Sequence, residues 1–294
     1  MVKDKTIGAT IFTAANYTIL TLLMILTLYP CIYVLFASFS DPVELYRASK
    51  LLLYPQGFSL EGYQIVLRNP WIWRSYLITI FYVTAGGLIS VSLTLLGGYT
   101  LSRRYLPGRF AVLLFITITM FFSGGLVPTF LLIQGLGLTN TVFAMLLPGA
   151  ISTYNLIVMK TFLQHIPDEM EESARIDGAH DFTILIRIII PLATPVIAVI
   201  SLFYMVSIWN SYIPPTIYLR NRSLFPLQVI LREILLAGDS NLNFGDTGGN
   251  EDMQAYIEAV KYSTIVVTTV PILCVYPFLQ RFFVKGVMLG AIKG

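Results

Sequence analysis

Long apolar runs without charged residues dominate the chain, and short polar segments separate them. An α-helix needs about 20 residues to cross the ~30 Å hydrocarbon core of a bilayer. Six runs reach that length, at 17–39, 77–101, 111–133, 141–163, 188–213 and 263–284. The pattern predicts an all-α integral membrane protein with six transmembrane helices, in a single domain covering 1–294.

Composition agrees with this assignment. Hydrophobic residues make up 56% of the chain, charged residues only 12%, and the mean hydropathy is +0.74. A soluble domain carries about 25% charged residues. The first run is too long for a signal-peptide core and lacks a small-residue cleavage site, so we expect an uncleaved anchor. Cys31 and Cys274 both lie inside predicted spans, where we expect them to be packing residues.

The largest concentration of charge lies between the fourth and fifth runs, in the segment 167–187, called the elbow below. Its acidic residues are Asp168, Glu169, Glu171, Glu172, Asp177 and Asp181. Pro167 followed by acids suits a helix N-terminus, because proline fits the first turn and acids interact favourably with the helix dipole. Gly178 then ends that helix. The sequence predicts two short helices joined by a bend outside the bilayer.

The loop charges predict an orientation. The loop 102–110 contains three arginines, whereas the connection 134–140 contains no charged residue. Basic residues in short loops favour the cytoplasmic side. We therefore expect the loop 102–110, the elbow and both termini to be cytoplasmic.

The predicted spans contain no charged residue or histidine over their central parts, which bears on the energy source. Ion-coupled carriers hold their ions with intramembrane ionisable groups or broken helices. The chain also lacks a phosphate-binding loop, since no Gly-Lys pair occurs in it. We therefore expect no ATPase site of its own; an ion-coupled secondary carrier or a channel is the alternative class.

Neither a metal site nor a nucleic-acid partner is indicated. The segment 239–252 matches a calcium loop only in part, because Phe244 stands where glycine is needed and Asn250 where the bidentate glutamate belongs. The net charge of +3 is too small to indicate nucleic-acid binding. Membrane lipid is the expected surroundings.

Aromatic and amide side chains gather near the ends of the fourth and fifth runs. Stacking rings and amide donors suit a sugar ring, whereas interfacial anchoring is the simpler interpretation of any single one. The candidates for a solute pathway are Tyr154, Asn155, Tyr204, Trp209, Asn210 and Tyr212.

The elbow also resembles a known motif. Glu172-Ser173-Ala174, then Gly178 and Ile188-x-Ile190-Pro191, resemble the EAA loop of ABC importer permeases, with Ser173 in place of alanine and Ile190 in place of leucine. Further segments are similar to the carbohydrate-type, MalG-related branch called LplC or YtcP. These are LPGA (147–150), FLQHIPDE (162–169), YTLSRRYLPGR (99–109), FSGGLVPTF (122–130) and FVKGVMLGAIKG (283–294).

This resemblance implies a type I ABC importer permease fold and a role as the permease subunit of a binding-protein-dependent oligosaccharide importer. It implies a second homologous permease, two ATPase subunits that hold ATP and Mg, and an extracellular solute-binding protein as partners. It implies no cofactor on this chain and no enzymatic activity. A non-sugar solute remains the alternative within the class.

The resemblance also assigns residues. The elbow would dock on an ATPase subunit, with Gly178 forming the bend, Glu172 meeting a basic partner, and Met170, Ala174 and Phe182 providing apolar contact. The complete set of coupling residues it implies is Glu171, Glu172, Ala174, Asp177, Gly178, Phe182 and Pro191. The C-terminal residues Lys293 and Gly294 would reach the ATPase subunits.

Overall fold

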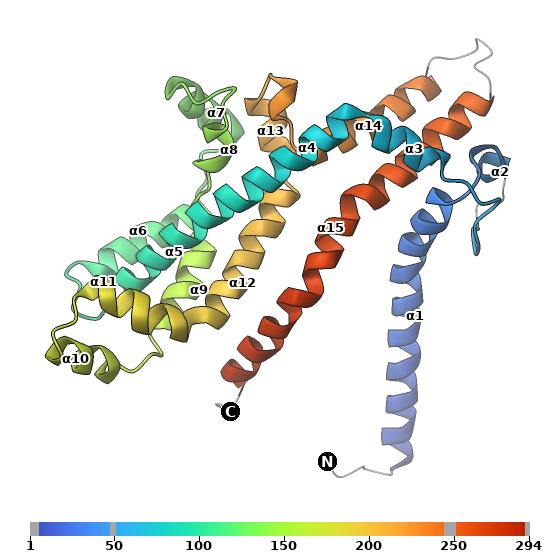
Figure 1. The fold of residues 1–294 in the computed structure, drawn as a ribbon. Coiled ribbons are helices and arrows are strands. Elements are labelled where there is room, and N and C mark those ends of the chain that lie inside the picture. Colours follow the sequence, from blue (N-terminus) through green and yellow to red (C-terminus); the bar gives the residue numbers. More distant parts are fainter. Residues whose placement is uncertain (1–5, 48–50, 244–250, 292–294) are drawn as a thin grey trace. The chain divides into compact units, whose positions relative to one another are not determined.

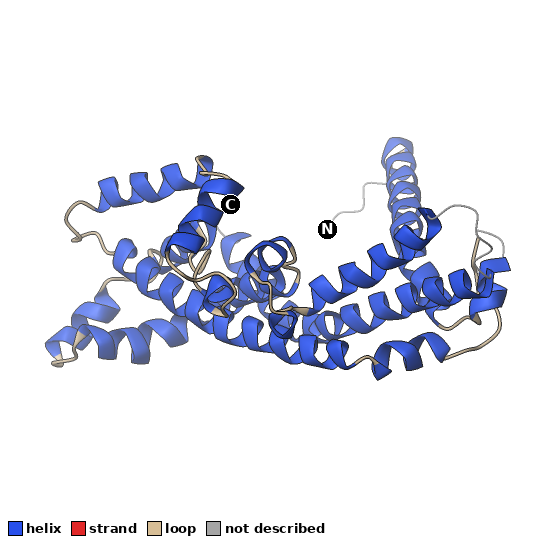
Figure 2. Cartoon of the chain, turned by 90° about the horizontal axis from the view of Figure 1, so that it is seen from above, coloured by secondary structure: helices blue, strands red, loops and turns tan. Residues whose placement is uncertain are grey.

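The computed structural model describes residues 6–47, 51–243 and 251–291 (Figure 1). Within these ranges the regular elements are helices, apart from one isolated bridge between Ser40 and Phe58. Figure 2 shows the same predominance of helix. The chain divides into two compact units, Met1–Pro70 with Leu231–Thr269 and Trp71–Ile230 with Val270–Gly294. Each is described by itself.

The first unit contains the long helix α1 (Ile7–Ser38) and the short helices α2 (Pro42–Arg47) and α3 (Glu61–Arg68). It also holds parts of α14 (Leu227–Asn243) and α15 (Glu251–Ala291). Most of α1 is exposed, and among its residues only Ala37 and Ser38, at its C-terminal end, are buried by the described parts of the chain. Helices α3 and α15 approach closely at Gly62, where a Cβ atom would collide with Ser263 and Ala259.

Two long helical rods form the second unit's frame. The first runs through α4 (Pro70–Phe81), a π-helical turn η1 (Tyr82–Gly86) and α5 (Gly87–Ser102). The second runs through α11 (Asp181–Ile184), a π-helical turn η2 (Leu185–Ile189) and α12 (Ile190–Trp209). In η2 the amide of Ile190 donates to the carbonyl of Leu185, five residues back. This wider turn lies directly before Pro191, which cannot continue the regular ladder because it has no N–H.

Two of the expected spans are interrupted. The run 111–133 divides into α6 (Arg109–Phe121) and α7 (Leu126–Gly135), bent by 116°. The break falls at Gly125, whose φ of 85° is a conformation that glycine adopts without steric cost. The run 141–163 divides into α8 (Phe143–Leu146) and α9 (Thr153–Leu163). With its 11 residues α9 rises about 16 Å, roughly half of a bilayer core.

Four helices of the described residues are long and apolar enough to cross a membrane, or five if the bent pair α6–α7 counts as one span. The four are Ile7–Ser38, Pro70–Ser102, Asp181–Trp209 and Gln254–Val275. They overlap the expected spans 17–39, 77–101, 188–213 and 263–284. A number of six spans remains a prediction.

The core of the second unit lies where α5, α9 and the α11–α12 rod meet. Its fully buried members include Met159 and Leu163 from α9 and Ile184, Ile189 and Ile200 from the rod. A Cβ atom on Gly98 of α5 would collide with Met159, so this glycine allows the two helices to pack closely. Because Ile184 and Ile189 are buried in this core, the beginning of the α11–α12 rod, which follows the Gly178 bend, is held in place.

A small staple joins the segment before α8 to the segment after α13 (Ile213–Tyr218). The amide of Asn140 donates to the carbonyl of Tyr218 at 2.8 Å. Its side-chain Oδ1 accepts from the amides of Arg220 at 3.0 Å and Asn221 at 2.8 Å. Asn140 has a φ of 60°, a left-handed conformation that asparagine tolerates better than most residues.

Candidate functional site

The elbow consists of α10 (Glu169–Ile176), a bend at Gly178 and the beginning of α11. Gly178 has a φ of 82°, and an added Cβ atom would meet nothing within 4 Å. The amide of Gly178 donates to Arg175 O at 3.0 Å and that of Ala179 to Ala174 O at 2.9 Å. This pair of bonds is a Schellman motif, which satisfies the last carbonyls of α10. The bend lies where the sequence predicted it.

The second half of the elbow is not a separate short helix. From Asp181 the helix continues through η2 and α12 to Trp209 as one rod of 29 residues. The expectation of two short helices is therefore wrong for the second one. The reason is that apolar residues from Ile184 onward pack into the core, so the helix has a buried face along which to continue.

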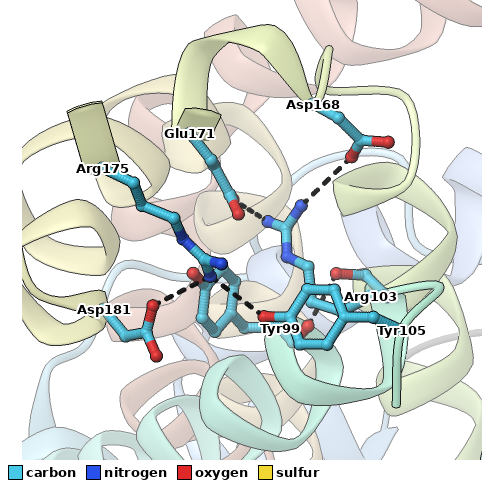
Figure 3. Close-up of polar contacts among 8 residues, drawn as sticks. Tyr99, Arg103, Tyr105, Asp168, Glu171, Arg175 and Asp181 are labelled. Atoms are coloured by element: carbon cyan, nitrogen blue, oxygen red, sulfur yellow. Dashed lines mark hydrogen bonds and ion pairs between the residues drawn. The ribbon is translucent and has the colours of Figure 1, made fainter. Parts of the chain in front are cut away.

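One acidic side chain of α10 turns inward. Glu171 is only 5% exposed and forms an ion pair with Arg103, which follows α5 and is also 5% exposed (Figure 3). Nη1 of Arg103 lies 3.6 Å from Oδ1 of Asp168, whose side chain is largely exposed. The guanidinium of Arg103 also lies over the ring of Tyr99, 4.5 Å from its centre. Two acidic side chains, one arginine and one aromatic ring thus meet at the inner end of the elbow.

A second, exposed contact ties the same loop to the elbow. Nη2 of Arg175 donates to Oδ1 of Asp181 at 2.9 Å and to the hydroxyl of Tyr105 at 3.2 Å (Figure 3). The Arg175–Asp181 pair bridges the Gly178 bend from one helix to the next. Exposed pairs of this kind contribute roughly 0–1 kcal/mol. The exposed Arg175–Asp181 pair therefore contributes little to holding the elbow, and breaking the buried Arg103–Glu171 pair should have the larger effect.

Burial and charge act in opposite directions on Glu171. Burial raises the pKa of its carboxyl, and the neighbouring Arg103 guanidinium lowers it, with burial the stronger effect. Without the guanidinium, burial would be opposed less and would raise the pKa of Glu171 further. Glu171 and Arg103 thus form one electrostatic unit.

Other side chains of the elbow are exposed, and several of them are apolar. Met170 is 44% exposed, Phe182 68% and Ile176 87%, and Glu172 is exposed among them. Ala174, expected to provide apolar contact, instead packs against the core of its own chain. Glu171, also assigned to partner contact, faces inward. The outer surface of the elbow is therefore formed by Met170, Glu172, Ile176 and Phe182, called the outer face below.

The remaining coupling residues have simpler positions. Asp177 is the exposed C-cap residue of α10, and Pro191 lies exposed in the first turn of α12. Lys293 and Gly294 lie outside the described residues, as do residues 244–250 of the segment 239–252.

Sequence analysis missed two residues of this site. Ile176 is an exposed β-branched apolar residue inside an acidic helix, a signal that the sequence carried. Arg103 entered only as an orientation marker. An acid-rich helix lying on the same side as an arginine-rich loop could have indicated the pairing, but not which acid takes part.

Three of the six solute-pathway candidates lie together at a cavity of about 600 Å³. Its lining includes Tyr154 and Asn155 of α9 and Tyr204 of α12, with hydroxyls from Ser90, Ser152 and Ser207. The hydroxyl of Tyr204 accepts from the amide of Ser152 at 2.9 Å. Tyr154 is exposed, whereas Tyr204 and Asn155 are buried.

The other three candidates lie elsewhere. The ring of Trp209 contacts that of Tyr76 edge to face, with centres 6.4 Å apart, beside an apolar groove. Nδ2 of Asn210 donates to Val206 O within its own helix, at 3.0 Å. Neither Asn210 nor Tyr212 lines the 600 Å³ cavity.

With this geometry known, comparison with known proteins assigns the chain to a family. Residues 6–289 match the model of the family described as "Binding-protein-dependent transport system inner membrane component". The chain belongs to this family. It is therefore a multi-pass membrane protein and the permease subunit of an ABC importer, a kind of subunit that has no ATPase site of its own.

Individual relatives cover almost the whole chain. The polygalacturonan/rhamnogalacturonan transport system permease protein YtcP of Bacillus subtilis is 40% identical over 97% of this chain and 99% of its own. Protein LplC of the same organism is 37% identical over 97% and 95%.

A solved structure agrees. A chain from the crystal structure of a bacterial ABC transporter that imports the acidic polysaccharide alginate superposes with a TM-score of 0.87 at 31% identity. The match covers 96% of this chain and 100% of that one. The type I importer permease fold is thereby shown.

Proposed function

We propose that this chain forms half of the translocation pathway of an oligosaccharide importer and receives the motion of an ATPase subunit through the elbow. The outer face is the observation that carries the proposal. Met170 and Ile176 of α10 and Phe182 of α11 expose apolar side chains, while Ala174 of α10 and Ile184 of α11 pack into the core of the chain. Exposed apolar residues rimmed by charge are typical of a protein interface. Relatives named as sugar permeases support the oligosaccharide.

The proposed assembly pairs this chain with a second homologous permease and two ATPase subunits. ATP and Mg are bound by the ATPase subunits, and an extracellular binding protein delivers the solute. Both termini and the elbow lie in the cytoplasm, on the evidence of the arginine-rich loop before α6. We expect the C-terminal residues Lys293 and Gly294 to contact the ATPase subunits. Glu172 meets a basic residue of one of these subunits.

The 600 Å³ cavity is the proposed solute contact on this chain. Hydroxyl and amide groups of Tyr204, Asn155 and Ser207 can hydrogen-bond sugar hydroxyls, and the exposed ring of Tyr154 offers a stacking surface. Trp209, Asn210 and Tyr212 form the outer end of the same helical region and are a weaker part of the proposal.

Reconstitution in liposomes tests the whole proposal. The chain is purified with its second permease and ATPase subunits, and uptake of uronate and neutral oligosaccharides is measured with the loaded binding protein present. We expect ATP-dependent oligosaccharide uptake that a protonophore leaves unchanged at constant ATP. Uptake of a non-sugar solute, with no uptake of any oligosaccharide, would show that the solute of this importer is not an oligosaccharide. Uptake by this chain without ATPase subunits, driven by an ion gradient, would contradict the proposal altogether.

Docking is tested separately by substitutions on the outer face. Phe182→Ala and Ile176→Asp should reduce the recovery of ATPase subunits with the purified permease, because they remove apolar contact area. Leu77→Ala, at an exposed apolar position of α4 remote from the elbow, is the matched control. Normal recovery of the ATPase with both outer-face variants would show that docking lies elsewhere.

A further inference from the structure

The buried ion pair between Arg103 and Glu171 joins two segments that are distant in sequence. Arg103 directly follows Ser102, the last residue of α5, and its backbone is extended with φ −74° and ψ 130°. Glu171 lies in the first turn of α10. Both side chains are more than nine-tenths buried. The pair therefore connects the cytoplasmic end of α5 to the elbow without any covalent link nearby.

Such a pair is a poor way to gain stability. Removing two charges from water costs several kcal/mol for each ion, and apolar residues of similar volume often stabilise a protein as well or better. What a buried pair provides is a single favourable orientation, because moving one partner leaves the other charge buried and uncompensated. The Arg103–Glu171 pair thus fixes the angle of α10 relative to α5.

The bend at Gly178 has no such fixation. An added Cβ atom there would meet nothing within 4 Å, and no buried ion pair of the described residues crosses the bend. The exposed Arg175–Asp181 pair crosses it but is open to solvent. The covalent chain through Gly178 is therefore not the only connection between α10 and the rest of the unit. The buried Arg103–Glu171 pair is a second connection, through which movement of α10 can reach α5.

Helix α5 connects this ion pair with the 600 Å³ cavity. The side of α5 that carries Ser102, Gly98, Thr94 and Ser90 is buried, at intervals of four residues. Ser90 lines the cavity, and the hydroxyl of Thr94 lies 2.7 Å from that of Tyr204. From position 103 to position 90 the helix rises about 20 Å. One rigid element therefore has the ion pair at one end and a cavity-lining hydroxyl at the other.

We propose that Arg103 is a positioning residue that transmits movement of the elbow to α5 through Glu171. Transmission through α5 acts in parallel with the covalent route through Gly178 into α11 and α12. The inference rests on the proposed function of the elbow. It adds a defined path from the ATPase contact to the solute cavity.

The test uses the full importer in liposomes, with the loaded binding protein. Glu171→Gln and Arg103→Gln remove one charge each, and the double variant removes both. In each single variant we expect ATPase subunits to co-purify within two-fold of wild type and stimulated ATP hydrolysis to continue. Solute uptake should fall about ten-fold, so that ATP consumed per solute rises about ten-fold. The double variant should be no worse than the worse single variant, because both residues act through one contact.

Two further variants separate transmission from folding. Arg103→Lys keeps the charge and should recover part of the lost uptake. Arg104→Gln removes the exposed neighbouring arginine and should leave the ratio of ATP to solute unchanged.

Three results would overturn the inference. The first is unchanged uptake in both single variants, and the second is independent, multiplying losses in the double variant. The third is loss of ATPase co-purification in parallel with uptake, which would make the pair a structural support of the docking surface. None of these would contradict the proposed function, which instead fails if the outer-face variants bind the ATPase normally.

Discussion

The hydroxyl of Tyr204 on α12 accepts a hydrogen bond from the backbone amide of Ser152 at 2.9 Å. Ser152 is the N-cap of α9, and its own Oγ accepts from the amide of Asn155 at 3.4 Å. One side chain of the long rod therefore holds the start of α9 after the break in the run 141–163. The 2.7 Å contact with Thr94 adds α5 to the same junction.

Tyr204→Phe should release this junction with little change in shape. It leaves the amide of Ser152 and the hydroxyl of Thr94 without this partner, at a cost of about 1–3 kcal/mol for a buried donor. We expect a lower thermal midpoint of the purified importer and reduced uptake. Tyr154→Phe, at an exposed ring of the same cavity, is the control for stability. A Tyr204→Phe variant as stable as wild type would show that the hydroxyl does not hold α9.

Gly178→Val should abolish transport through backbone strain alone. The left-handed conformation costs a residue with a Cβ atom roughly 1–2 kcal/mol, and more for a branched one, whereas no neighbour would be displaced. We expect the protein to reach the membrane but to bind the ATPase weakly and show no stimulated ATP hydrolysis.

Gly135→Val is a suitable control, because that glycine also has nothing near its Cβ position but does not have a positive φ. If Gly178→Val keeps full stimulated ATPase activity and normal assembly, the elbow is not the coupling element.

Glu172→Ala should weaken ATPase association only mildly. Glu172 is exposed, and a partly solvated charge pair contributes about 1 kcal/mol, or roughly five-fold in Kd. Titration of the ATPase subunit against the permease in detergent measures this, and the effect should shrink at high salt. Asp177→Ala, at another exposed acid of the elbow, provides the comparison. An effect of Glu172→Ala that is independent of salt would argue against a charge pair.

Asn140→Ala should destabilise the staple between the segments near Tyr218 and α8. The change removes the acceptor for the amides of Arg220 and Asn221 and leaves a left-handed residue without its compensating bonds. We expect a loss of about 1–3 kcal/mol. Asn140→Asp keeps the acceptor and should be nearly neutral, and thermal unfolding of the purified importer distinguishes the two. Equal midpoints for both variants would contradict the role of the side chain.

The sequence predicted the elbow well because charge is rare elsewhere in this chain. A dense acidic segment with proline before it and glycine inside it has few alternatives to a short helix and a bend, and both are found at Glu169–Ile176 and Gly178. The sequence alone could not predict which acidic residue of the elbow turns inward. That choice depends on Arg103, whose position relative to the elbow is set by the packing of α5 against α9.

Hydropathy also could not find the breaks in the runs 111–133 and 141–163. Residues such as Phe122 and Leu147 are as apolar as those of a continuous span, and the interruption comes from backbone conformation at Gly125 and Gly149, with φ of 85° and 77°. Averaging over a window conceals single residues of this kind. The glycines were visible in the sequence, but only packing decides which glycine interrupts a membrane helix.

The π-helical turn at Leu185–Ile189 has a consequence for the phase of the rod in which it lies. Such a turn holds one residue more than a regular helix would, and each residue of an α-helix turns the chain by about 100°. Deleting a single residue there would swing Phe182 around the rod by about that angle while Tyr204 kept its place. One extra amino acid in this turn thus sets the rotational position of Phe182, on the outer face, relative to Tyr204, which lines the cavity.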